Sequence, residues 1–111
     1  MTNPIHLLML AVIHTQDLEL ATRALQPLGV PVVPLASSGG FLGQGNATVL
    51  IGLPDGQEED ALLALRISCS KRVEYLSMPL EGTPLSMPTA IPVTVGGATV
   101  FALPVERFEE I

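Results

Sequence analysis

The feature that most constrains the fold is a nearly uninterrupted apolar run at residues 4–13, Pro-Ile-His-Leu-Leu-Met-Leu-Ala-Val-Ile. A run of this kind without polar alternation is typical of a central strand that is covered on both faces. It is too short to cross a bilayer, and it lacks a basic segment before it and a small-residue cleavage site after it. We therefore interpret residues 4–13 as a buried strand rather than as a signal peptide or a membrane anchor.

Helical patterns follow this run and return in the middle of the chain. Residues 15–17, Thr-Gln-Asp, are expected to cap and begin a helix, and Gly29 is placed to end it. Asp55 and Glu58 form a capping-box pattern that predicts a second helix, closed by the Lys-Arg pair at 71–72. The apolar positions at helical spacing in the first helix are Leu18, Ala21, Leu25 and Leu28.

Two strand patterns flank a glycine-rich segment between the predicted helices. They lie at residues 30–36 and 47–53. Because Pro31 and Pro34 each lack a backbone N–H donor, the first of these strands is expected at a sheet edge or to be irregular.

The C-terminal third carries short strand patterns separated by loops. We expect strands at residues 91–95 and 98–103, with a bulge or a close backbone contact at the intervening Gly-Gly pair. The stretch before them is compatible with a short strand at 73–78, followed by a loop without periodicity over 79–88. A last helical turn is expected over residues 104–110.

The order of these elements predicts the fold class. Two β-α-β halves, with an additional strand at the C-terminal end, predict an α+β fold: a ferredoxin-like split βαβ sandwich, one antiparallel sheet with both helices on one face. The 111 residues suffice for a single domain spanning 1–111 and are too few for two independent cores. Because 48% of the residues are hydrophobic and 14% are charged, we expect the other face of the sheet to be apolar and covered by association of subunits.

Charge and cysteine content exclude several classes of function. Eleven acidic residues against five basic ones give a formal charge of -6, which opposes binding to duplex DNA and bulk RNA. The single cysteine, Cys69, excludes an internal disulfide and mildly favours a cytoplasmic location. We therefore expect neither a nucleic-acid partner nor membrane insertion.

Candidates for catalysis or metal binding are few. A nucleophile would pair Cys69 with His6 or His14, but Cys69 is expected near a helix C-terminus, where the dipole opposes a thiolate. No motif links these three residues, and none shows metal-ligand spacing. The acidic groups at 58–60 and 106–110 are typical of helix starts and solvated faces rather than of a general acid and base. The residues favour a buried structural thiol, with no metal and no catalytic residue.

The glycine-rich segment at residues 37–46, Ser-Ser-Gly-Gly-Phe-Leu-Gly-Gln-Gly-Asn, is the strongest candidate for ligand binding. Glycines let consecutive N–H groups converge on an anion, and hydroxyl groups add donors. The segment is neither a P-loop nor a dinucleotide fingerprint, because it leads into a strand and lacks Gly-Lys-Ser/Thr. A phosphodiester held by backbone N–H groups, with Phe41 against a base, suits the chain better than a triphosphate. A plain hairpin loop, with Phe41 and Leu42 filling a subunit contact, is equally open at this point.

Two blocks of sequence resemble a known family. They are Leu-Ala-Ser-Ser-Gly-Gly-Phe-Leu-x-x-Gly-Asn-x-Thr at 35–48 and Val-Gly-Gly-Ala-Thr-Val-Phe-x-Leu-Pro-Val-x-x-Phe at 95–108, with Cys-x-x-Arg at 69–72 between them. Together they resemble the PII-like cyclic di-AMP receptor family, and the resemblance runs from residue 12 to residue 108. Residues 14–17, His-Thr-Gln-Asp, look like a drifted form of the Gln-Asp-Gln-Asp of that family.

The resemblance implies a ferredoxin-like homotrimer without enzymatic activity that binds a nucleotide in the clefts between its subunits. It implies a cytoplasmic PII-like signal-transduction protein with cyclic di-AMP as its ligand, no other cofactor, and long loops that engage a protein target. In such a pocket, backbone N–H groups hold phosphate, apolar side chains cover adenine and an amide orients the ligand. The ligand-binding residues implied for this chain are Gly40, Phe41, Leu42, Asn46, Gly52 and Phe101.

Two segments depart from the family pattern. Where the family has a polar strand that often carries Arg and Thr, this chain has Pro31, Val33 and Pro34, which supply neither a guanidinium nor a hydroxyl. Losing a charged contact costs about 1.5–3 kcal/mol, or roughly ten- to a hundredfold in affinity. Glu109 and Glu110 add negative charge that would oppose an anionic ligand.

The sequence thus predicts a receptor for cyclic di-AMP and leaves three alternatives. One is a PII-like sensor of another adenine nucleotide or a different small effector. The second is a structural trimer whose glycine-rich loop only contacts a partner. The third is a thiol enzyme that uses Cys69.

Overall fold

The helices and strands of the described residues follow one another in the order that the hydrophobic patterns predict. The computed structural model describes residues 4–35, 45–79 and 88–111. The elements are β1 (Leu7–His14), the 3-10 turn η1 (Thr15–Asp17), α1 (Leu18–Leu25), the 3-10 turn η2 (Gln26–Leu28), β2 (Val32–Leu35), β3 (Asn46–Leu53), α2 (Glu58–Ser68), β4 (Arg72–Pro79), β5 (Pro88–Val95) and β6 (Ala98–Pro104).

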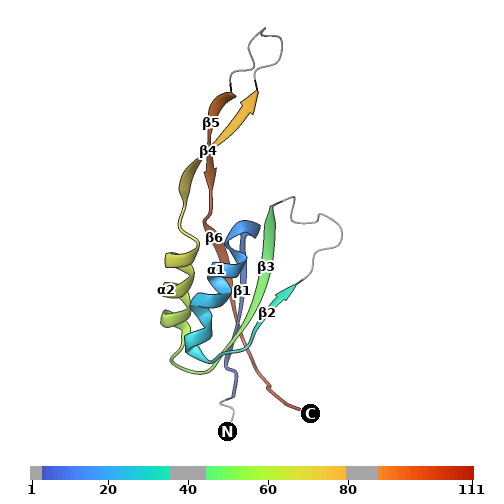
Figure 1. The fold of residues 1–111 in the computed structure, drawn as a ribbon. Coiled ribbons are helices and arrows are strands. Elements are labelled where there is room, and N and C mark those ends of the chain that lie inside the picture. The colour runs from blue at the N-terminus through green and yellow to red at the C-terminus, as the bar shows by residue number, and fades with distance from the viewer. Residues whose placement is uncertain (1–3, 36–44, 80–87) are drawn as a thin grey trace.

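Four of the strands form one antiparallel sheet in the order β2-β3-β1-β6. Both helices lie on one face of this sheet (Figure 1), which confirms the predicted ferredoxin-like α+β fold. The apolar first strand is central, as its sequence indicates, and β2 lies at an edge, where its prolines do not interrupt a second ladder. Gly29 has a φ of 66° and ends the first helical region, which confirms the predicted cap.

The strands β4 and β5 form a separate two-stranded sheet, which we call the hairpin. It is inserted between α2 and β6 and projects from one end of the body (Figure 1). The radius of gyration is 18.2 Å, whereas a compact chain of this length has a value of about 13 Å. The loop that was predicted over residues 79–88 is shorter at both ends, because Pro79 and Pro88 pair with each other as strand residues. Residues 80–87 lie outside the described residues.

The core lies between the four-stranded sheet and the two helices. Alternate residues of β1 and β3 point toward the helices and are buried, as the period of two along a strand requires. They meet the apolar positions that were predicted on α1 and the equivalent positions on α2. The fully buried members of this core include Met9, Ile13, Leu25, Val49, Ile51 and Leu53.

Two predicted helix starts form no side-chain cap bond. Residues 15–17 begin the helical region as predicted, with Asp17 in the first turn of η1, but the buried Asp17 carboxylate binds an arginine from a distant part of the chain instead of a backbone N–H of α1. Helix α2 begins at Glu58 with Gln57 as its N-cap residue and without a side-chain cap bond, so the capping box with Asp55 does not form. Acidic residues nevertheless fill the first turn of α2, where they favour the helix dipole.

The predicted end of the second helix and the predicted C-terminal helical turn are also wrong. The Lys-Arg pair at 71–72 does not close α2, because the helix ends at Ser68 and Arg72 is the first residue of β4. Residues 105–111 form no helical turn. Instead, the Val105 N–H donates to the His6 carbonyl at 2.9 Å, which keeps the chain extended beside the start of β1.

Candidate functional site

One face of the four-stranded sheet carries no helix, and we call it the open face. Directly paired residues of neighbouring antiparallel strands lie on the same face. Pairing therefore places one apolar residue from each strand in a row across the middle of the open face, and the row consists of Val33, Leu50, Leu10 and Phe101. Phe101 is 55% exposed and Val33 is 48% exposed. A single chain leaves this row uncovered.

The open face becomes more polar toward the hairpin. The next row consists of Leu35, Thr48, Val12 and Thr99, and beyond it Asn46 pairs with His14. The Thr48 hydroxyl and His14 Nδ1 are buried atoms that find no hydrogen-bond partner in the part of the chain that the structure describes. The face thus combines an apolar middle with polar side chains at one end, which suits a ligand that has both apolar and polar parts.

The described residues of the predicted ligand site all lie on the open face. Asn46 pairs with His14, Gly52 pairs with Leu8, and Phe101 pairs with Leu10. Within one chain they do not form a single pocket, because Asn46 and Gly52 are at opposite ends of β3 and about 20 Å apart at 3.3 Å per residue. The other predicted ligand residues, Gly40, Phe41 and Leu42, lie outside the described residues.

Gly52 has a packing role that the sequence did not reveal. Its N–H donates to the Pro31 carbonyl at 3.1 Å. A Cβ at this position would lie 3.1 Å from Pro31 Cγ and 3.3 Å from Ile5 Cδ1, which is tighter than ordinary van der Waals contact. A side chain at Gly52 would therefore push the segment before β2 away from β3.

A polar hollow of about 260 Å³ lies where the open face meets the hairpin, and we call it the base hollow. It is formed by the end of β1, the start of β3, the residue before β4 and the turn between β5 and β6. The residues that line it are Val12, Ile13, His14, Asn46, Lys71, Gly96, Gly97, Ala98 and Thr99. One predicted ligand residue, Asn46, belongs to this hollow.

The Gly96-Gly97 turn allows the close backbone contact that its sequence predicts. The two residues have φ angles of 86° and 87°, which side-chain-bearing residues rarely adopt. A Cβ on Gly96 would lie 2.3 Å from the Ser70 carbonyl oxygen, and the Gly97 N–H donates to the Cys69 carbonyl at 2.6 Å. The turn therefore packs directly on the link between α2 and β4 and fixes one wall of the base hollow.

An ion-pair cluster fastens the hairpin to the body. Arg72 Nη2 donates to Asp17 Oδ1 at 2.7 Å, and Arg72 Nε donates to Glu74 Oε1 at 3.3 Å. Gln16 Nε2 donates to the same Glu74 oxygen at 3.1 Å. The hydrogen bond to Asp17 raises the pKa of Arg72, so its guanidinium is charged. Asp17 is fully buried, and this guanidinium compensates its charge.

The turn η1 contacts two functional regions at once. The Thr15 N–H donates to the Gly45 carbonyl at 2.6 Å, where the chain leaves the glycine-rich segment. The next two residues, Gln16 and Asp17, bind the base of the hairpin. No local sequence pattern predicts this link, because Asp17 and Arg72 are 55 positions apart.

Cys69 lies in an apolar setting that does not favour nucleophilic chemistry. The thiol is buried, and burial raises its pKa, although the neighbouring Ser68 hydroxyl at 3.5 Å opposes this effect. A raised pKa lowers the fraction of the reactive thiolate. Among the described residues, no group of three or more His, Cys, Asp or Glu side chains could hold a metal ion.

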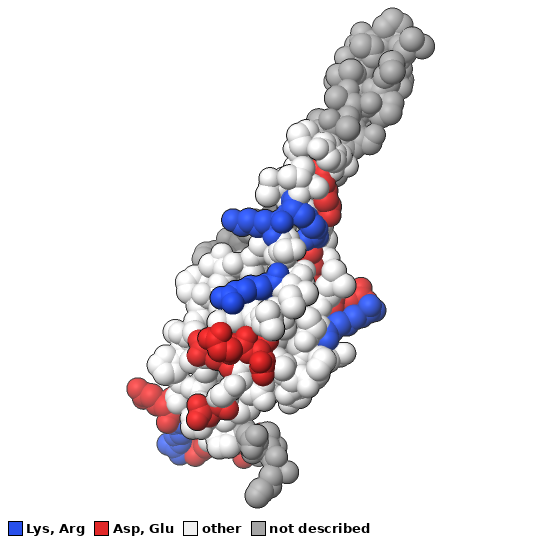
Figure 2. Space-filling model, turned by 90° about the vertical axis from the view of Figure 1, so that its left-hand side faces the viewer, with Lys and Arg blue, Asp and Glu red and all other residues white. Residues whose placement is uncertain are grey.

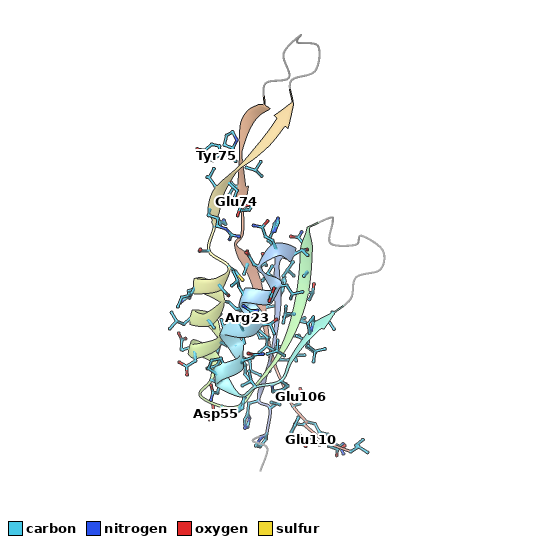
Figure 3. All side chains as sticks on the ribbon, viewed as in Figure 1. Arg23, Asp55, Glu74, Tyr75, Glu106 and Glu110 are labelled. Carbon is cyan, nitrogen blue, oxygen red and sulfur yellow. The ribbon has the colours of Figure 1, made fainter. Side chains whose placement is uncertain are left out.

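Charge is unevenly distributed over the surface. Three of the five basic residues fall within residues 66–72, at and before the hairpin base. Figure 2 shows blue side chains beside the base of the hairpin, with red ones next to them, and a further group of red side chains on the part of the body away from the hairpin. Asp55, Glu106 and Glu110 all lie toward the end away from the hairpin, which carries Glu74 and Tyr75 (Figure 3). Within one chain, the acidic C-terminal segment is therefore remote from the base hollow.

The described residues thus combine a ferredoxin-like body, an open apolar sheet face, a polar hollow at one end of that face and a projecting hairpin. Comparison with known families identifies the class of protein. The family model described as the cyclic-di-AMP receptor matches residues 6–111. The chain belongs to the cyclic-di-AMP receptor family.

A solved structure shares the fold. The crystal structure of a functionally unknown protein from Pediococcus pentosaceus ATCC 25745 matches with a TM-score of 0.74 and 30% sequence identity. The match covers 96% of this chain and 98% of that protein. In the parts of this chain that the structure describes, no helix is long and apolar enough to span a membrane.

Proposed function

We propose that this chain is a cytoplasmic signal-transduction protein that binds cyclic di-AMP in clefts between the subunits of a homotrimer. The observation that carries the proposal is the family match over residues 6–111. The open face supports it, since Asn46, Gly52 and Phe101 all lie there. The receptor family implies a role in binding rather than in catalysis.

Association of subunits through the open face accounts for its composition. Val33, Leu35, Phe101 and Leu103 are each between 44% and 55% exposed in a single chain. Burying a large apolar side chain contributes about 1.5–3 kcal/mol. Further copies of the same chain offer the same apolar rows, so a closed ring of subunits covers the face of every member.

The ligand chemistry fits the gradient along the open face. Adenine stacks on the exposed ring of Phe101 and on Phe41, while the amide of Asn46 and the backbone of residues 40–42 orient the phosphodiester groups. Gly52 lies at the other end of β3 from Asn46. In the proposed trimer, the two positions therefore contribute to one cleft only where Gly52 of one subunit faces Asn46 of its neighbour. The glycine-rich segment acts as a binding loop rather than as a plain hairpin loop.

The hairpin passes ligand occupancy to a protein target. It presents the exposed side chains of Val73 and Tyr75, which are 55% and 69% exposed. The turn η1 connects it to the end of the glycine-rich segment, because Thr15 binds Gly45 while Asp17 binds Arg72. Binding of the ligand beside the end of the glycine-rich segment at Gly45 therefore changes the contacts that hold the hairpin.

Calorimetric titration of the purified protein with cyclic di-AMP tests the proposal, with ATP, AMP and cyclic di-GMP as controls. We expect one ligand per subunit at micromolar affinity or better. Phe101→Ala should weaken binding about fivefold to a hundredfold, because a lost base stack is worth about 1–3 kcal/mol. Leu63→Ala provides the matched control, since Leu63 is 54% exposed on α2, away from the open face. Equal affinity of both variants, or no heat with cyclic di-AMP on a folded trimer, would contradict the proposal.

A second candidate is a PII-like sensor of another adenine nucleotide. The composition of β2 favours it, because Val33 and Leu35 are the residues that this strand presents to the open face and neither can form a hydrogen bond to a ligand. Tight binding of ATP or AMP without binding of cyclic di-AMP in the same titration would support this candidate. A scaffold without a ligand would bind none of the four nucleotides.

A further inference from the structure

The charge of the base hollow is opposite to the net charge of the chain. The chain carries eleven acidic residues, yet none of the described residues that line the hollow is acidic. Its one charged lining residue is Lys71. An acidic protein thus keeps a polar concavity free of carboxylates at the end of its open face, which favours occupation by an anion.

The charge of Lys71 is available to a ligand. Three of the five cations have carboxylate partners: Arg23 binds Glu19, Arg72 binds Asp17 and Glu74, and Arg107 binds Glu109. Within the described part of the chain, Lys71 forms no ion pair. The neighbouring Arg72 cannot replace it, because its guanidinium is already occupied by the buried Asp17.

The backbone positions Lys71 across the hollow. Its stem lies against Gly97, where a Cβ would come within 3.1 Å of both Cγ and Cε of the lysine. Because Gly97 has no side chain, the stem can lie flat on the turn that forms one wall of the hollow. The close contact limits the freedom of a side chain that is otherwise flexible and exposed.

His14 adds a second group to the same hollow. Its Nδ1 is buried and has no hydrogen-bond partner among the described residues, although buried polar atoms almost always have one. Its Nε2 lies on the side of Gly45, 3.7 Å from where a Cβ of that residue would be. The ring therefore stands between the base hollow and the end of the glycine-rich segment.

We propose that Lys71 and His14 form a phosphate subsite in the base hollow. Lys71 supplies the charge and His14 supplies a ring N–H, and together they hold one phosphodiester of a cyclic dinucleotide whose bases lie on the apolar rows of the open face. This assignment deepens the proposed function and rests on it for the identity of the ligand. The same chemistry would also take free inorganic phosphate.

The first arm of the test measures affinity. Cyclic di-AMP is titrated into the full chain and into Lys71→Met, His14→Gln and Arg66→Met. We expect roughly ten- to a hundredfold weaker binding for Lys71→Met, the range for a lost charged hydrogen bond, and a smaller loss for His14→Gln. Arg66→Met removes the same charge from α2, where Arg66 forms no ion pair with another described residue and does not line the hollow, so the affinity of this variant should change less than about threefold. Circular dichroism melting checks that all variants fold.

The second arm uses inorganic phosphate as the probe and the two histidines as reporters. The ring signals of His14 and His6 are followed by NMR during the titration at constant ionic strength. His6 is an internal control, since it is exposed and lies beside Pro54 and Asp55 at the other end of β1. We expect the His14 signals to shift, the His6 signals to stay, and the shift to disappear in Lys71→Met.

The two arms separate the subsite from the proposed function. If the wild type binds cyclic di-AMP and all three variants bind equally well, the subsite is wrong and the proposed function stands. If the wild type does not bind cyclic di-AMP but phosphate shifts His14 alone, the subsite stands and the proposed function is wrong. Absence of both effects overturns both.

Discussion

The two faces of the four-stranded sheet are similar in sequence and different in what covers them. On the helix-covered face, Met9, Ile51 and Leu25 are fully buried. On the open face, the equivalent rows of β1 and β3 are half-buried, and Val33 and Phe101 at the edges are about half exposed. The chain covers the first face with its own helices and leaves the second uncovered. In the proposed trimer, folding stability and assembly therefore depend on opposite sides of one sheet.

The largest effect is expected from truncating the helix-covered face. Leu25→Ala removes a side chain that is 0% exposed, and such changes lower the free energy of unfolding by about 2–5 kcal/mol because of the cavity left behind. Urea unfolding measures it. Leu103→Ala makes the same chemical change on the open face, and its effect should grow as the protein is diluted, because it acts on association. Equal losses for Leu103→Ala at high and low protein concentration would contradict the division between the faces.

A charge on the open face should break assembly while leaving the subunit folded. Leu103→Glu places a carboxylate in the row formed with Leu8 and Gly52, and burying an unpaired charge between subunits is costly. Light scattering should then report the 11.7 kDa of a single chain, with an unchanged circular dichroism spectrum. Leu63→Glu on α2 is the control for an added surface charge and should leave the larger species intact. Loss of assembly in both variants would mean that the open face is not the interface.

The hairpin base provides a third comparison, between a buried and an exposed carboxylate. Arg72→Met leaves the fully buried Asp17 without its cation, so the start of β4 should exchange its amide hydrogens markedly faster. Glu74→Gln removes the partner that is 44% exposed, and its effect should be small. Hydrogen exchange followed by mass spectrometry compares the two. A faster exchange for Glu74→Gln than for Arg72→Met would show that Asp17 does not hold the hairpin.

The smallest effect concerns Cys69 and alkaline pH. Because burial raises the pKa of the folded thiol, its contribution to stability is present below the ordinary thiol pKa and is lost as the pH rises through the raised value. The wild type should lose stability over this window slightly faster than Cys69→Ala, in urea unfolding at several pH values. Iodoacetamide should modify Cys69 slowly in the native protein and rapidly in urea. Rapid native alkylation would revive the thiol-enzyme alternative.

Local patterns predicted much of the fold because they report local physics. The apolar run of β1 gave a central strand, the prolines of β2 gave an edge, and the Gly96-Gly97 pair gave a close backbone contact. Contacts between distant positions were missed. Asp17 stands at the start of a helix, as its residue type indicates, and only the folded chain shows that its carboxylate binds Arg72. The hairpin was missed for a similar reason, since its strands pair with each other rather than with the main sheet.

The residues of the candidate site also differ in how far the sequence predicts them. The resemblance supplied Asn46, Gly52 and Phe101, and the strand register places all three on the open face. It assigned no ligand role to His14, which stands where the family has Gln, or to Lys71, an unspecified position of the Cys-x-x-Arg block. The two residues line one hollow only because β1 and the hairpin base converge in the fold. The position of a site residue along a known motif can be transferred from sequence. The electrostatics of a hollow depend on which neighbouring charges are already paired.

Hydrogen exchange with and without cyclic di-AMP tests the central claim that the open face is the binding face. The account predicts that the ligand slows exchange in residues 37–50 and 96–103, while α1 and α2 stay unchanged because they cover the opposite face. Protection confined to the helices, or binding heat without protection in either open-face segment, would contradict it.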